Sequence, residues 1–206
     1  MVKNDDVSAS SVNTLFVDFH GTICHDNYWR SLAKEDFKRV QKVLFEADAS
    51  LVNEWMRGGY TSEEINEIVA ERAGLDVDLL WQAFTRDCKK MRVSQELLSV
   101  IETLRDTNRV VLITDNMDCF NRFTAPELGL DTVFDDIANS HYEGALKTEW
   151  NGETFRKHLS GALAHAVLVD DSNTSCQFFE KLGGVSYEVT ETMPAIRHLK
   201  ELTASK

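Results

Sequence analysis

The sequence has few of the residues that mark fibrous, low-complexity or disulfide-stabilised proteins. Its 206 residues include 2 prolines, 10 glycines and 4 cysteines, which excludes a collagen-like chain and a small disulfide scaffold. No stretch approaches about 18 consecutive apolar residues, so a membrane-spanning helix has no support. Apolar residues at 43% and charged residues at 27% are instead typical of a globular protein with a substantial core.

Positive charge is also scarce. The chain has 22 Lys and Arg against 34 Asp and Glu, a net charge of −12, and no basic run interrupts this acidity. Such a field repels nucleic acid and anionic lipid, so we expect neither as a partner. The cysteines form no Cys-x-x-Cys pair and residues 1–13 have no apolar signal segment, so we expect reduced thiols in a cytoplasmic protein.

Three short apolar runs each end at a hydroxyl or carboxylate side chain. They cover residues 14–17, 110–113 and 166–169 and are followed by Asp18, Thr114 and Asp170. Their composition predicts buried strands, and the helical patterns between them predict a parallel α/β sheet. Ligands bind beyond the carboxyl ends of such strands. We therefore expect Asp18, Thr114, Asp170 and Asp171 to meet at one edge of the sheet.

The rest of the chain shows weaker patterns. Further elements are expected as strands at 132–137 and 185–189, and as helices at 97–104, 155–163 and 194–202. Between residues 25 and 93 the apolar spacing is helical throughout, and Thr61 with Glu64 fits a capping box. We therefore expect two units, one formed by residues 1–24 and 94–206, the other a helical module of residues 25–93.

The segment Asp18-Phe19-His20-Gly21-Thr22 resembles the first motif of the haloacid dehalogenase (HAD) superfamily, whose phosphatases usually read Asp-x-Asp-Gly-Thr. Thr114, Lys147 and Asp170-Asp171 follow in the order of that family's other motifs. The resemblance covers nearly the whole chain. It implies a Rossmann-like, three-layer α/β core with a parallel sheet and an inserted α-helical cap of the C1 type at residues 25–93.

The resemblance also implies catalytic roles. Asp18 would be the nucleophile that forms an aspartyl-phosphate, Thr114 would hold a phosphoryl oxygen, and Lys147 would neutralise charge. The same need follows from physics, because each pair of like charges at about 4 Å costs on the order of 4 kcal/mol at an effective dielectric of about 20. The chemistry thus requires a lysine and a divalent cation, and Mg²⁺ prefers carboxylate, phosphate and water oxygens.

The resemblance implies a metal site formed by the first and the last of these motifs. Asp18, Asp170 and the backbone carbonyl of His20 would bind Mg²⁺, and Asp171 would support it through a water or a neighbouring hydrogen bond. The expected activity is Mg²⁺-dependent hydrolysis of a small phosphorylated metabolite. The sequence does not identify that metabolite, the oligomeric state, or the cap residues that set specificity.

One position departs from the family pattern. His20 stands where the phosphatases usually have the aspartate that protonates the leaving group and then activates water. A histidine can do both, as imidazolium and then as imidazole. Two alternatives stay open: a C–halogen or C–P bond hydrolase, although those relatives usually carry tyrosine or alanine there, and a non-catalytic binding or regulatory domain that retains Asp18 and Asp170.

Several residues near these motifs have simpler interpretations. Trp29, Trp55 and Trp81 recur within helical apolar patterns, so we expect core positions rather than a substrate platform. Cys24 and Cys119 lie near the predicted site, and we expect both thiols to be inert.

Overall fold

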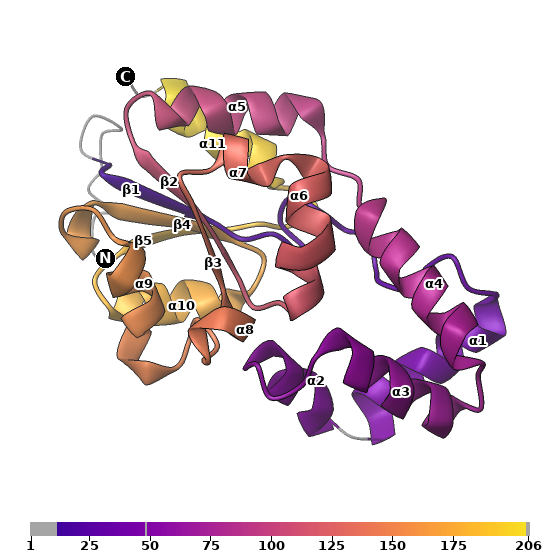
Figure 1. Cartoon of the computed structure of the whole chain (residues 1–206). Helices are drawn as coiled ribbons and strands as arrows, with labels where there is room; N and C mark the ends of the chain where they lie inside the picture. Colours follow the sequence, from indigo (N-terminus) through magenta and orange to yellow (C-terminus); the bar gives the residue numbers. More distant parts are fainter. Residues whose placement is uncertain (1–11, 48, 205–206) are drawn as a thin grey trace.

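A parallel sheet forms the centre of the molecule (Figure 1). The structure is a computed structural model that describes residues 12–47 and 49–204. Its five strands follow the order β3-β2-β1-β4-β5. They are β1 (Thr14–Val17), β2 (Arg109–Thr114), β3 (Asp136–Asn139), β4 (Ala166–Asp170) and β5 (Val185–Glu188). The predicted α/β class with a parallel sheet is therefore confirmed.

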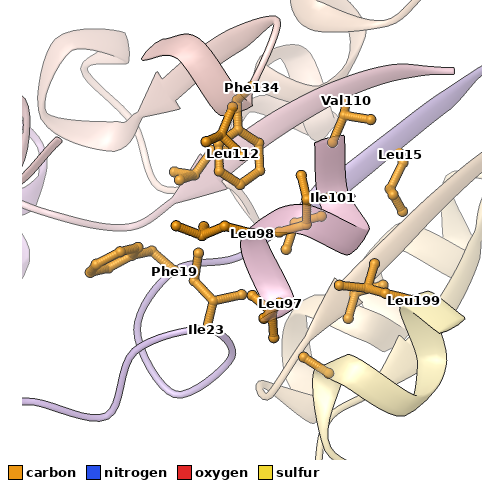
Figure 2. Packing of buried hydrophobic residues seen from close by; sticks show 14 of the residues in the cluster. Leu15, Phe19, Ile23, Leu97, Leu98, Ile101, Val110, Leu112, Phe134 and Leu199 are labelled. Atoms are coloured by element: carbon orange, nitrogen blue, oxygen red, sulfur yellow. The ribbon is translucent and has the colours of Figure 1, made fainter. Parts of the chain in front are cut away.

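Helices cover both faces of the sheet, which makes three layers (Figure 1). One face carries α5 (Gln95–Arg105), α6 (Ala125–Leu128), α7 (Leu130–Val133) and α11 (Ala195–Ala204). The other carries α8 (Ser140–Glu143), α9 (Glu153–His158) and α10 (Asn173–Lys181). Successive strand side chains point to opposite faces, so Leu15 packs in the cluster with Ile101 (Figure 2), whereas Phe16 packs in the cluster with Phe155.

Three short helical segments lie between the longer elements. These are the π-helix η3 (Phe120–Thr124) and the 3₁₀ turns η4 (Trp150–Gly152) and η5 (Leu163–His165). Within the described ranges, no helix combines the length and apolar character that crossing a membrane requires.

A second group of helices lies to one side of the sheet (Figure 1). It contains α1 (Lys34–Gln41), the π-helix η2 (Lys42–Ala47), α2 (Ala49–Met56), α3 (Ser62–Ala73) and α4 (Val77–Lys89). These helices enclose their own apolar cluster around Trp55 and Phe84, which also takes in Cys119 from the sheet unit. The predicted capping box is present, because Thr61 accepts from the backbone N–H of Glu64 and Glu64 accepts from that of Thr61.

Two predicted elements were wrong in their bounds. The strand expected at 132–137 begins only at Asp136, because Gly129, with a left-handed φ of 63°, ends α6 and lets another helical turn form first. The helix expected at 155–163 begins at Glu153 and ends at His158. Beyond it, the backbone N–H of Ser160 donates to Thr14 Oγ1 at 2.8 Å, which holds the extended chain against β1.

Candidate active site

The two central strands place two carboxylates side by side. β1 and β4 pair in parallel with Val17 opposite Val169. Asp18 directly follows β1, and Asp170 is the last residue of β4. From β1 the chain adds β2 and β3 on one side of the sheet, and then returns to add β4 and β5 on the other side. The direction of strand addition therefore reverses between β1 and β4. Such a reversal opens a crevice at the carboxyl edge, so both carboxylates lie where a ligand is expected to bind.

Lys147 joins these two carboxylates. Its Nζ lies 2.7 Å from Asp18 Oδ1 and 2.6 Å from Asp170 Oδ2. All three side chains are buried. The arrangement brings together three of the residues that the sequence predicted for catalysis and metal binding.

Burial controls the ionisation of this cluster. It raises the pKa of Asp18 to about 7, against the opposing charge of Lys147 and with the help of Asp170. Burial alone would lower the pKa of Lys147, but the surrounding carboxylates of Asp18, Asp170 and Asp115 outweigh it and raise that pKa. Lys147 is therefore a permanent cation facing an excess of carboxylates.

The loop that carries Lys147 is held by contacts that the sequence did not reveal. The backbone N–H of Lys147 donates to Asp115 Oδ1 at 2.8 Å, and burial raises the pKa of Asp115. Glu149 accepts from the backbone N–H of Leu146 at 3.0 Å and pairs with Arg57 at 2.6 Å. Because Arg57 follows α2, this ion pair connects the lysine loop to the second group of helices.

A third carboxylate completes a possible metal site. Asp18, Asp170 and Asp171 each offer an oxygen, and these atoms lie within 4.8 Å of one another. The Asp171 carboxylate lies close to the backbone of Gly21, where a Cβ atom would be only 2.1 Å from Asp171 Oδ2. Gly21 also has a left-handed φ of 85°, so glycine suits this position. Thr22 Oγ1 accepts from the Asp171 backbone N–H at 3.1 Å. Three oxygen ligands of this kind fit Mg²⁺ chemistry.

Two further predicted residues follow or end strands at the same carboxyl edge of the sheet. Thr114 ends β2 with a side chain that is 1% exposed, and its Oγ1 has no hydrogen-bond partner among the described residues. A buried hydroxyl without a partner is costly, so it is available to a ligand oxygen. His20 lies two residues after Asp18 and is exposed.

A cavity of ≈ 280 Å³ begins at His20 and Asp115 and extends to the second group of helices. The other lining residues are Asn27, Tyr28, Trp29, Gln41, Leu44, Phe45, Val52, Trp55, Met56, Asn116 and Met117. No local sequence pattern predicts this cavity, because its lining comes from segments far apart in the chain.

The tryptophans and cysteines largely follow expectation. Trp29 and Trp55 are buried in the helical core, and Trp81 is half-buried against it. Trp29 and Trp55 also line the cavity, so the same residues belong to the helical core and to the cavity wall. All four cysteines are free and buried, and burial raises the pKa of the Cys24 thiol.

The sequence comparisons found no relatives: no family model matches the chain, and no curated protein matches it. Solved structures do match. A HAD family enzyme from Bacteroides thetaiotaomicron has a TM-score of 0.67 at 15% identity, over 87% of this chain and 94% of its own. Another structure of that enzyme holds magnesium and inorganic phosphate.

Two other neighbours span nearly the same length. A predicted HAD-like family hydrolase from Porphyromonas gingivalis has a TM-score of 0.66 at 18% identity, over 92% of this chain and 98% of its own. L-2-haloacid dehalogenase from Xanthobacter autotrophicus, with chloropropionic acid covalently bound, has a TM-score of 0.59 at 10% identity, over 93% and 88%. The chain therefore has the fold of the HAD-like hydrolases, as its motifs predicted.

Proposed function

We propose that this chain is a Mg²⁺-dependent phosphatase that hydrolyses a small phosphorylated metabolite through a phosphorylated Asp18. The observation that carries the proposal is the ammonium group of Lys147, held 2.7 Å from Asp18 and 2.6 Å from Asp170 at the carboxyl edge of the sheet. The Bacteroides enzyme supports it, since a protein of this fold binds both magnesium and phosphate.

The proposed reaction has two displacements. An Asp18 carboxylate oxygen attacks phosphorus, and the bond from phosphorus to the leaving oxygen breaks as His20 donates a proton to that oxygen. Water then attacks phosphorus and gives a proton to His20, and the Asp18–phosphorus bond breaks to release inorganic phosphate. Thr114 Oγ1 and Lys147 Nζ hold phosphoryl oxygens during both displacements.

The metal site would use oxygen ligands from the same edge. Asp18, Asp170 and the backbone carbonyl of His20 would hold Mg²⁺, and Asp171 would support it through a water or a hydrogen bond. The ion supplies positive charge that offsets repulsion between the carboxylates and the phosphate dianion. Asp18, Asp170 and Asp171 suit a cation site, because their oxygens lie within 4.8 Å of one another. Negative charges this close repel each other, and a bound cation would reduce that repulsion.

We assign residues 25–93 to a cap inserted into a core of residues 1–24 and 94–206. The cap contributes Trp29 and Trp55 to the cavity lining, and the core contributes His20 and Asp115. A unit in this position would exclude water and select the group attached to the phosphate.

A second candidate activity, hydrolysis of a C–halogen bond, is favoured by the fold shared with the Xanthobacter dehalogenase. A screen separates the two. Purified protein with Mg²⁺ is assayed against a panel of phosphate esters and acyl phosphates for released phosphate, and against 2-haloacids for released halide, with Asp18→Asn as control. Phosphate release that Asp18→Asn abolishes supports the phosphatase. Halide release alone supports the dehalogenase, and metal binding without either product supports a non-catalytic domain.

A further inference from the structure

We propose that the cavity takes an uncharged, apolar leaving group of about one aromatic ring, and that it rejects phosphate esters whose leaving group carries a carboxylate or a second phosphate. The inference rests on the proposed function, because the group placed in the cavity is the part of the substrate beyond the phosphoryl group. It names the class of ester on which the site acts.

The cavity wall on the helical side is mainly apolar. It includes Leu44 and Phe45 from η2, Val52 from α2, and the rings of Trp29 and Trp55. The volume of ≈ 280 Å³ exceeds the roughly 150 Å³ of an apolar cavity that binds benzene. Burial of an apolar group contributes about 25 cal/mol for each Å² removed from water, so one ring attached to a phosphoryl group has both the space and the driving force to bind.

Apart from His20, which the proposed reaction engages with the leaving oxygen, the described lining of the cavity has no basic side chain. Of the described residues that line it, none is Lys or Arg, and the charged or titratable ones are His20, Tyr28 and Asp115. Asp115 is itself a carboxylate whose Oδ1 accepts from the backbone of Lys147. An anionic leaving group would therefore lose its water opposite another carboxylate, and an unpaired charge in such a place is strongly disfavoured.

Two cations next to lining residues, Lys147 beside Asp115 and Arg57 after Met56, are already paired. Lys147 contacts Asp18 and Asp170, and Arg57 pairs with Glu149 and Glu54. Redirecting either of them to a leaving group would break these contacts and leave carboxylates without a partner. The charges around the cavity thus weaken the binding of esters with an anionic leaving group relative to esters with a neutral one.

Two local features indicate a wall shaped for a ligand. Phe45 lines the cavity yet is 56% exposed, in a π-helical segment, and such segments are frequent at functional sites. Trp29 has a left-handed φ of 57°, and its buried indole N–H has no acceptor among the described residues. Backbone conformations of this kind are costly and cluster at functional sites.

The same charge pattern argues against a haloacid in this cavity. Chloropropionic acid, bound in the Xanthobacter dehalogenase, carries a carboxylate. The described lining of this cavity has no lysine or arginine to receive that group.

The test compares two non-hydrolysable ligands by calorimetric titration in the presence of Mg²⁺: phenylphosphonate and 4-carboxyphenylphosphonate. We expect phenylphosphonate to bind at least about tenfold more tightly, because like charges brought together disfavour binding. Equal or tighter binding of the carboxylated ligand would overturn the inference, and so would the failure of both ligands to bind.

Three variants sharpen the comparison. Gln41→Arg adds a cation to the lining and should shrink or reverse the preference, and an unchanged ratio in the folded variant would count against the inference. Phe45→Ala should weaken phenylphosphonate binding by about fivefold, because an apolar contact is lost. Leu79→Ala, the matched control, removes a side chain that is 65% exposed and outside the cavity lining, and it should bind like the wild type.

Turnover of phenyl phosphate is measured separately, so that the two proposals can fail independently. Preferential binding of phenylphosphonate without hydrolysis of any ester would support the preference of the cavity and contradict the phosphatase. Ester hydrolysis with equal binding of both phosphonates would contradict the inference and leave the phosphatase standing.

Discussion

The ammonium nitrogen of Lys147 lies 2.7 Å from Oδ1 of Asp18, across 129 positions of sequence. The same nitrogen lies 2.6 Å from Oδ2 of Asp170. Because all three groups are buried, removal of one partner strands a charge that water cannot reach, at a typical cost of about 3–5 kcal/mol. Substitutions that test catalysis here must therefore preserve the shape and polarity of the side chain.

Asp18→Asn should reduce turnover by at least about 10³-fold, because an amide is a poor nucleophile. The fold should survive, since the amide oxygen can still accept from Lys147. Steady-state phosphate release measures the first effect, and circular dichroism measures the second. Glu102→Gln, an exposed carboxylate-to-amide control on α5, should retain wild-type activity. If Asp18→Asn keeps most of the wild-type rate, with deamidation excluded by mass spectrometry, the covalent mechanism is wrong.

Metal removal should silence the enzyme reversibly. Excess chelator should abolish phosphate release and added Mg²⁺ should restore it, because the acidic cluster requires a cation to admit a phosphate dianion. In calorimetric titrations, Asp171→Asn should weaken Mg²⁺ binding by about 10–100-fold, as expected for a residue that supports the metal, and Asp170→Asn should weaken it further. Full activity in excess chelator, or wild-type Mg²⁺ affinity in Asp170→Asn, would contradict these assignments.

His20→Ala should slow alkyl phosphates by about 10²-fold or more and activated aryl or acyl phosphates much less. A basic leaving group needs a proton in the transition state, whereas an activated one departs without it. Pre-steady-state bursts isolate the phosphorylation of Asp18 from the later attack by water. His20→Asp should preserve or raise the alkyl phosphate rate. Equal losses for both substrate classes in the burst phase would give His20 a positional role, and no loss would remove it from the mechanism.

Asp118 lies between β2 and η3 and accepts hydrogen bonds from Trp55 and Ser62 in the second group of helices. We expect this contact to stabilise the protein in a pH-dependent manner. Burial alone would raise the pKa of Asp118, but hydrogen bonds from Ser62, Trp55 and Arg122 hold it below its usual value. A carboxyl group whose pKa is lowered by folding stabilises the protein above its unfolded pKa of about 3.9 and loses that contribution as pH falls through the folded value. Acid should therefore destabilise the wild type more than Asp118→Asn.

Urea unfolding at several pH values measures this effect. At pH 7, Asp118→Ala should lower the free energy of unfolding by about 2–3 kcal/mol, because buried donors of Trp55 and Ser62 lose their acceptor. Glu67→Gln, at an exposed position on α3, should leave the free energy unchanged. Equal losses of stability on acidification in the wild type and in Asp118→Asn would show that this contact does not stabilise the protein in a pH-dependent manner.

The sequence predicted the parts of the fold that depend on local patterns. Buried strands read as short apolar runs, so the strands that precede Asp18 and contain Thr114 and Asp170 were located within a residue. The bounds of β3 and α9 were missed because they depend on particular contacts. Gly129 admits an extra helical turn, and the link from Ser160 to Thr14 joins residues that no local pattern relates.

The candidate site divides in the same way. Asp18, Lys147 and Asp170 follow from motifs, and the structure places Lys147 within hydrogen-bond distance of both carboxylates. The cavity does not follow from any motif, because residues such as Phe45 and Asn116 meet only through packing of the helical unit against the sheet. The sequence could therefore indicate the proposed chemistry at phosphorus but not the proposed class of leaving group.

Acid-quenched mass spectrometry tests the central claim most directly. The protein is mixed with Mg²⁺ and phenyl phosphate, stopped in acid within the first turnover, and digested. The account predicts that the peptide containing Asp18 gains the mass of one phosphoryl group, that fragmentation places it on Asp18, and that Asp18→Asn shows none. Hydrolysis of the ester with no phosphorylated peptide at any quench time, or with the phosphoryl group on another residue, would contradict it.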